Sequence, residues 1–305
     1  TTEIYTLSLH DALPILKRNN SLTCLVPIIF IMAIFTAVVG LITDDGGGVY
    51  YFTNTHGQVI QMDGRGIYKF DSLLAGTGFR GTNIVTLFIA LPFLLIAYIT
   101  YLKGSVIGRI ILIGALLPFL YCSASMTFSA AYNSLFLVYT AMFSASLFAT
   151  IFTITSFDLC LITERVKPGF PYIGIAIFLI GTGIVTLLVW MSELLLSLNT
   201  GVVPETLGPY TTMYTHGFDL AIIAPAFILI GNFLLKRKPT GILLAGPLLI
   251  FCILVGFYII GQSIYQYLAG LVFSIEIYIV VVGSWIVIGM IAFLFVKSYF
   301  LNLSK

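Results

Sequence analysis

The stretch SLTCLVPIIFIMAIFTAVVGLI, residues 21–42, decides the fold class of this chain. It contains no charged residue and is long enough to cross the hydrocarbon core of a bilayer, which takes roughly 20 apolar residues in a helix. It is too long for the apolar core of a signal peptide and lacks a small-residue cleavage site. We therefore expect it to stay in the protein as a membrane anchor.

Seven further long apolar runs follow, and together with the first they predict an all-α membrane protein with a bundle of eight transmembrane helices. The predicted spans are 21–42, 83–102, 110–130, 134–158, 171–196, 217–235, 241–260 and 270–296. The composition agrees, since 59% of residues are hydrophobic and only 9% are charged, against roughly a quarter in soluble domains. The net charge of +2 provides no basic face for nucleic acid. The bilayer is thus the partner that the composition predicts.

The first fifteen residues, TTEIYTLSLHDALPI, resemble a translated sequencing adapter. We therefore exclude residues 1–15 from fold reasoning and treat residues 16–305 as a single transmembrane domain. Outside this segment the chain has two histidines, His56 and His216.

Charge placement predicts the orientation of the bundle. With the start of the chain inside, the inner segments hold eleven basic residues: Lys17, Arg18, Lys103, Arg109, Arg165, Lys167, Lys236, Arg237, Lys238, Lys297 and Lys305. The outer segments hold three, Arg65, Lys69 and Arg80. This positive-inside bias predicts a multi-pass protein of the cell membrane with both termini in the cytoplasm. Most acidic residues, by contrast, fall at or near the outer face.

Residues 43–80 form a long outer loop in which short β-rich runs alternate with glycine-containing turns. The runs are VYYFT (49–53), QVIQM (58–62) and IYKF (67–70), and they predict a small antiparallel meander. So small a sheet is marginally stable alone, so we expect it to rest on the helix ends. We interpret the loop as a structural lid; the alternative is a cap that grips a ligand, with His56 in one of its turns.

One constant shift along the chain, without gaps, aligns Pro92 with Pro225, Lys103 with Lys236 and Gly108 with Gly241. An internal duplication would make the protein a 4+4 parallel repeat, a plan that some transporters use. The alternative is chance, because apolar sequences match easily and inner lysines follow from the positive-inside rule. Each proline also predicts a kink within its helix.

Ionisable groups within a membrane are costly and tend to be functional, and three acidic residues in or near the outer parts of the predicted spans are candidates. They are Glu193, Asp219 and Glu276. His216 and Asp219 are three residues apart on one helix face, so they could form a hydrogen-bonded pair, share a proton or bind a cation. The alternative for Asp219 is a helix-capping role.

No motif in the chain predicts a metal or cofactor. The four cysteines are scattered singly, and HExxH, HxH, Walker A, GxGxxG and GxSxG are all absent. Transport driven by ATP hydrolysis in this chain alone is thereby excluded.

Four segments resemble a family of bacterial eight-helix integral membrane proteins with no established activity. They are GRGIYKFD (64–71), RGTNIVTL (80–87), YNSLFLVY (132–139) and YTTMYTHGFDLAIIAP (210–225). The resemblance implies eight helices and an outer β-rich loop. Asn83 stands where this pattern leads us to expect aspartate.

These observations favour a small-molecule permease or a ligand-binding membrane protein with an outward-facing polar pocket. The pocket would be lined by His216, Asp219, Glu276, Glu193, Tyr210, Thr211 and Asn133. One alternative is a membrane-embedded enzyme at the outer leaflet, with His216 as acid/base and Asp219 orienting it. Another is a subunit of a membrane complex without chemistry of its own. The sequence names no protein partner.

Overall fold

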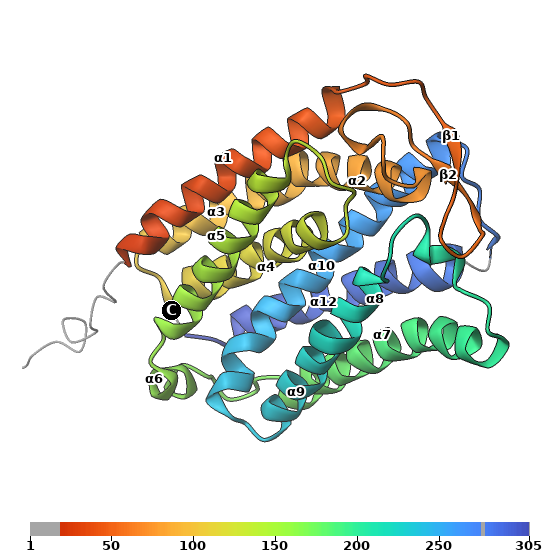
Figure 1. Ribbon diagram of the computed structural model, residues 1–305. Coiled ribbons are helices and arrows are strands. Elements are labelled where there is room, and N and C mark those ends of the chain that lie inside the picture. Colours follow the sequence, from red (N-terminus) through yellow and green to blue (C-terminus); the bar gives the residue numbers. More distant parts are fainter. Residues whose placement is uncertain (1–18, 276–277, 305) are drawn as a thin grey trace, which may run out of the picture.

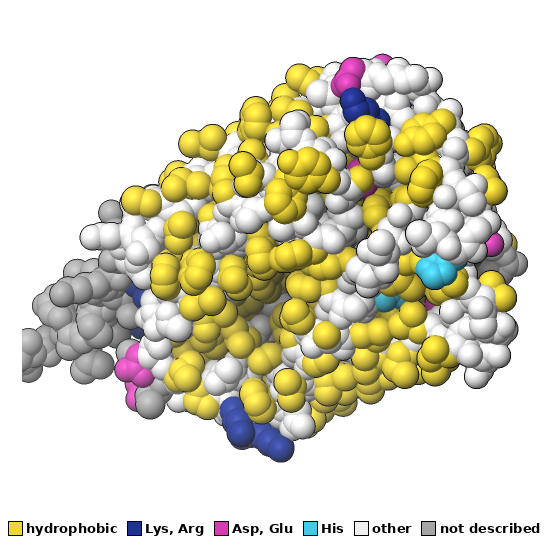
Figure 2. Space-filling model, viewed as in Figure 1, with side chains coloured by type: hydrophobic (Ala, Val, Ile, Leu, Met, Phe, Trp, Pro, Cys, Tyr) yellow, Lys and Arg dark blue, Asp and Glu magenta, His cyan; other side chains and the backbone are white. Residues whose placement is uncertain are grey.

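The computed structural model describes residues 19–275 and 278–304, and in this part of the chain eight helical segments are long and apolar enough to cross a membrane. They are Asn20–Ile42 (α1), Leu73–Leu102 (α2, Leu73–Val85, and α3, Leu91–Leu102), Val106–Phe128 (α4), Phe136–Thr155 (α5), Tyr172–Thr200 (α7), Tyr214–Leu235 (α8, Tyr214–Phe218, and α9, Ala224–Leu235), Pro239–Leu268 (α10) and Tyr278–Leu301 (ending in α12, Ser284–Leu301). The predicted eight-helix bundle is confirmed (Figure 1). Hydrophobic side chains cover most of the visible face (Figure 2), so the chain is a polytopic membrane protein. The adapter-like residues 1–15 lie outside the described residues.

Polar side chains set the helix boundaries at the places where the apolar runs end. Asn19 caps α1 by accepting a hydrogen bond from the backbone N–H of Ser21, and Ser72 and Ser105 cap α2 and α4 in the same manner. Such caps satisfy N–H groups that have no partner within the helix. Gly201 ends α7 in the left-handed conformation, which a residue without a Cβ adopts at little cost.

Helices α4 and α10 form the centre of the bundle. Two thirds (67%) of the most apolar stretch of each is buried, against 6% for the last span. Helix α10 packs against α2, α4, α9 and α12. The buried side chains divide into two large clusters, one drawn mainly from α1 to α5 and the other mainly from α7 to α12. We call the first four spans the first half and the last four the second half; the two meet where α2 and α4 pack against α10 (Figure 1).

The same interruption occurs in the second span of each half. A π-helical turn at Thr86–Ala90 separates α2 from α3, and another at Asp219–Ile223 separates α8 from α9. The shift that aligns Pro92 with Pro225 also aligns Thr86 with Asp219, the first residues of the two turns. It likewise aligns the first residue of α4 with the first residue of α10. The predicted breaks at the two prolines thus take the form of π-helical turns. Proline has no N–H to donate to the preceding turn, which removes a hydrogen bond of the regular helix.

The loop after α1 contains a two-stranded hairpin, in which β1 (Tyr50–Thr53) pairs antiparallel with β2 (Val59–Met62). The prediction of a third strand at 67–70 is wrong, because the chain forms a 3-10 turn at Gly66–Tyr68 instead. Gly66 has a φ of 57°, and the turn directs the Tyr68 side chain into the bundle, where it is buried. The chain thus buries the large Tyr68 ring in the bundle instead of pairing as a third strand at the edge of the sheet.

The hairpin lies at one end of the bundle, which we call the hairpin end (Figure 1). The opposite end, which we call the basic end, carries the loops after α3 and α9 with Lys103 and Lys236. The hairpin rests on the chain before α8, since Asn54 donates to the carbonyl of Gly208 (2.9 Å) and Gln58 to that of Val203 (2.9 Å). The first half therefore covers part of the second half at this end.

Candidate functional site

Asp219 is a buried acidic residue at a break in its membrane helix. It opens the π-helical turn of the second half, directly after α8 (Tyr214–Phe218), and Pro225 is the second residue of α9. π-Helical turns within α-helices occur frequently at functional sites because they displace a side chain from the regular helical register. Asp219 is 6% exposed, so its carboxylate is buried within a predicted membrane span.

Two neutral donors from two other membrane helices hold this carboxylate. The Tyr121 hydroxyl of α4 donates to Oδ1 (3.1 Å), and the Trp190 indole N–H of α7 donates to Oδ2 (2.9 Å). Within residues 19–275 and 278–304, no lysine, arginine or histidine forms an ion pair with Asp219. A buried carboxylate without a basic partner is stabilised either by a proton or by a cation.

His216 and Glu193 form a second polar pair, on the hairpin side of Asp219. His216 Nε2 lies 2.8 Å from Glu193 Oε2, and the Thr206 hydroxyl donates to Glu193 Oε1. The Trp190 ring packs against the His216 ring, with centroids 4.2 Å apart. Trp190 therefore links the two pairs, because its ring contacts His216 and its N–H bonds Asp219.

The structure brings His216, Asp219 and Glu193 together, but not in the pairing that the sequence predicts. His216 and Asp219 are not bonded to each other. Trp190 and Glu193 are three residues apart on α7, as His216 and Asp219 are on the facing segment, and the two helices run antiparallel. Because the two spacings match, His216 lies opposite Glu193 and Asp219 lies opposite Trp190. His216 therefore bonds Glu193, and Asp219 accepts a hydrogen bond from Trp190.

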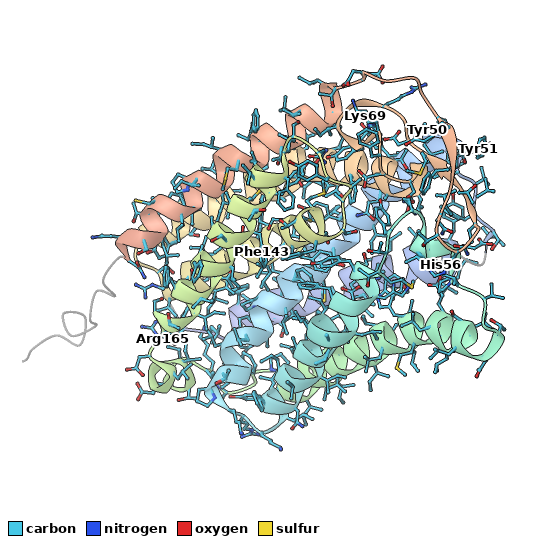
Figure 3. The ribbon with its side chains drawn as sticks, viewed as in Figure 1. Tyr50, Tyr51, His56, Lys69, Phe143 and Arg165 are labelled. Carbon is cyan, nitrogen blue, oxygen red and sulfur yellow. The ribbon has the colours of Figure 1, made fainter. Side chains whose placement is uncertain are left out.

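The other predicted site residues lie elsewhere. Tyr210 donates to Asp71 at the hairpin end (2.8 Å), and Thr211 is exposed. Asn133 accepts from the backbone N–H of Leu135 (2.9 Å), so it shapes the turn before α5. Glu276 lies outside the described residues. His56 is exposed at the tip of the hairpin (Figure 3).

A further buried carboxylate, Asp71, joins three loops at the hairpin end. Its Oδ1 accepts from the backbone N–H of Ala131 (2.7 Å) and from the Tyr210 hydroxyl, whereas Oδ2 has no hydrogen-bond partner among the described residues. Burial raises the pKa of Asp71 to about 7, although both hydrogen bonds oppose this shift. Nearby, Arg80 forms a buried ion pair with Asp63.

The first half contains a small cavity of about 30 Å³ beside its own π-helical turn. Its polar lining comes from Thr36, Tyr68, Thr82, Asn83, Thr86 and Tyr139 of the first half and from Tyr258 of α10. The Thr86 and Tyr258 hydroxyls lie 3.2 Å apart, and Asn83 donates to the Tyr68 hydroxyl (2.8 Å). This volume is enough for water, and no charged side chain lines it.

The arrangement around Asp219 has the chemistry of a proton or cation site rather than of a metal centre. Among the described residues, no group of three or more His, Cys, Asp or Glu side chains could hold a metal ion. Sequence reasoning missed Trp190 and Tyr121, because neither lies in a recognisable motif with Asp219. No protein-family model, curated protein or solved structure matches this chain.

Proposed function

We propose that this protein is a permease that moves a small molecule across the membrane and couples the movement to protonation of Asp219. The observation that carries the proposal is the burial of this carboxylate in a broken membrane helix, where its hydrogen bonds among the described residues come from two neutral donors. An ionised side chain in that setting is costly, and such residues occur in proton relays of pumps and transporters. Broken membrane helices are also a recurring feature of transporter binding sites.

The two-half architecture supports alternating exposure of the site. The Asp219 carboxylate belongs to the second half, yet Tyr121 belongs to α4 of the first half. A movement of one half against the other would therefore change the contacts of the carboxylate. Parallel repeats in transporters undergo such rocking movements.

The hairpin end faces the outside in this proposal, and both termini are cytoplasmic. Among the described residues, the basic end and its helix termini carry eight lysine and arginine residues: Lys103, Arg109, Arg165, Lys167, Lys236, Arg237, Lys238 and Lys297. The hairpin end carries three, Arg65, Lys69 and Arg80. The positive-inside rule favours this orientation. Glu193, whose side chain is 29% exposed, would then link outside water to His216.

Proteoliposomes loaded with a pH-sensitive dye provide the test. Cationic, anionic and neutral small solutes are added outside in turn, and internal pH is followed for the wild type and Asp219→Asn. We expect at least one solute class to drive a change in internal pH in the wild type and none to do so in the variant. A wild type that is silent with every class, or a variant that equals it, refutes the proposal. Asp45→Asn, which removes an exposed acid at the hairpin end, serves as the matched control.

One observation favours a second function, that of a membrane enzyme at the outer leaflet. The His216–Glu193 pair has the geometry of a general acid/base oriented by a carboxylate, 2.8 Å apart. In this candidate Glu193, rather than Asp219, orients the imidazole. A change in membrane lipid or isoprenoid products on loss of His216, with no solute-driven change in internal pH, would favour the enzyme over the permease.

A further inference from the structure

A continuous row of aromatic side chains leads from the lipid-facing surface to Asp219. We call it the aromatic row, and its members are Phe143, Phe128, Tyr214, Phe218 and Tyr121. Successive ring centroids are 5.4, 5.9, 5.5 and 5.5 Å apart. Phe128, the last residue of α4, is 57% exposed, whereas the Tyr121 hydroxyl at the other end of the row bonds Asp219.

The aromatic row crosses the boundary between the two halves. Phe143 belongs to α5 and Phe128 to α4 of the first half, whereas Tyr214 and Phe218 belong to α8 of the second half. Figure 2 shows that this face of the molecule is hollowed and that hydrophobic side chains line the hollow. Figure 3 places Phe143 on this face, between the ribbons of the two halves. The aromatic row therefore joins this hydrophobic face to the buried carboxylate.

At its inner end the aromatic row reaches a carboxylate, that of Asp219, surrounded by aromatic side chains. Asp219 has no basic partner among the described residues, and the rings of Trp190, Tyr121, Tyr214 and Phe218 lie close to it. Aromatic faces attract cations, and aromatic cages recognise quaternary ammonium groups. The Tyr214 hydroxyl is buried near Ser125 and makes no well-formed hydrogen bond with a described residue, so it can accept a polar group of a ligand.

We propose that the site binds a lipophilic organic monocation, such as an amine or an onium ion with aromatic groups. It enters from the membrane along the aromatic row and pairs with the Asp219 carboxylate. The carboxyl proton leaves to the aqueous phase as the cation binds, so proton and cation compete for the same group. The inference rests on the proposed function in that it names the substrate class of the same site. His216 and Glu193 are the titratable pair facing the site from α8 and α7, and Tyr121 faces it from α4.

Binding of radiolabelled tetraphenylphosphonium to the full chain in nanodiscs tests the inference. We expect saturable binding to the wild type, with affinity reduced on the order of tenfold or more in Asp219→Asn, because the variant keeps the side-chain shape and loses the charge. Tetraphenylborate, which has the same shape and the opposite charge, is expected not to compete. Asp45→Asn is expected to bind like the wild type. Equal affinity in the wild type and Asp219→Asn, or equal competition by tetraphenylborate, overturns the inference.

A second variant keeps the test decisive if Asp219→Asn does not fold. Tyr214→Leu removes a ring of the aromatic row and leaves both donors of the carboxylate in place. Its affinity for tetraphenylphosphonium is expected to fall several-fold because a cation–π contact is lost, and an affinity equal to that of the wild type contradicts the inference. Saturable binding without any solute-driven change in internal pH supports the cation site while refuting the permease. Coupled flux of another solute without saturable tetraphenylphosphonium binding supports the permease and refutes the cation site.

Discussion

Thr86 and Asp219 open the π-helical turns in the second span of each half, at positions related by the shift that aligns Pro92 with Pro225, and each contacts a tyrosine from the other half. Thr86 lies 3.2 Å from the Tyr258 hydroxyl of α10, and Asp219 accepts from the Tyr121 hydroxyl of α4. Only Asp219 is ionisable, and it has a second donor in Trp190. Both halves therefore have the backbone break, whereas the ionisable side chain at the break belongs to the second half alone.

The largest effect on activity is expected when Asp219 is replaced by threonine, the residue that opens the π-helical turn of the first half. Asp219→Thr removes the only ionisable group of its turn, so we expect it to abolish solute-driven proton movement in proteoliposomes. Thr86→Val is expected to retain most of this activity and to lower the free energy of unfolding by about 1 kcal/mol, because the buried Tyr258 hydroxyl loses its contact with the Thr86 hydroxyl. Complete loss of activity in both variants would show that both turns perform the chemistry.

The buried acid at the hairpin end of the first half, Asp71, should act on stability rather than on transport. Burial raises its pKa to about 7 in the folded protein, from the ordinary value of 3.8. The folded state therefore binds a proton that the unfolded state releases, and stability falls as pH rises from about 4 to about 7. The expected loss is up to a few kcal/mol, at about 1.4 kcal/mol per pKa unit.

Chemical unfolding in detergent, measured across this pH range, checks the Asp71 prediction. Asp71→Asn should flatten most of the slope, and Asp45→Asn, which changes an exposed acid, should retain it. A residual slope of the same sign is expected from Asp63, because burial also raises its pKa. An unaltered slope in Asp71→Asn would exclude this carboxyl group as the cause.

Two glycines offer a test in which the halves should behave alike. A Cβ on Gly108 would lie 2.5 Å from the carbonyl oxygen of Thr100, and one on Gly241 would lie 2.5 Å from the carbonyl carbon of Phe233. Thr100 and Phe233 are themselves equivalent under the shift that aligns the two glycines. Alanine at either position should cost about 1–3 kcal/mol of folding free energy, by similar amounts, because backbone must move in both. Thermal unfolding of the two variants measures this, and a large difference would limit the repeat to the π-helical turns.

The sequence predicted the number of spans because hydrocarbon demands long apolar runs. It placed the start of the second span at 83, whereas α2 begins at Leu73. Arg80 explains the difference, because a charged residue at this position predicted a loop. In the structure, Asp63 forms an ion pair with Arg80, so that the arginine is accommodated within the helix. The third strand was mispredicted for a related reason, because periodicity at 67–70 does not reveal that Tyr68 is buried among helices.

The candidate site was predictable to the extent that it follows from spacing within one segment. His216 and Asp219 share a helix face, and Glu193 lies at the end of a neighbouring span. Their actual partners depend on the register between α7 and α8, which no single-segment pattern contains. Trp190 and Tyr121 were missed for this reason, since only packing brings them to the carboxylate.

The smallest expected effect is the difference between removing the two tyrosine hydroxyls. Tyr121→Phe deprives a buried carboxylate of one of its two donors, which should cost about 1.5–3 kcal/mol. Tyr258→Phe should cost about 1 kcal/mol or less, since the Thr86 hydroxyl can turn back to a carbonyl of its own helix. Unfolding of both variants in the same detergent measures the difference. Equal losses would mean that Asp219 is held as a neutral acid at that pH, and repeating the pair at higher pH should then separate them. If the two variants lose equal free energy of unfolding at every pH, the Tyr121 hydroxyl does not stabilise an ionised Asp219, and the comparison between the two turns fails.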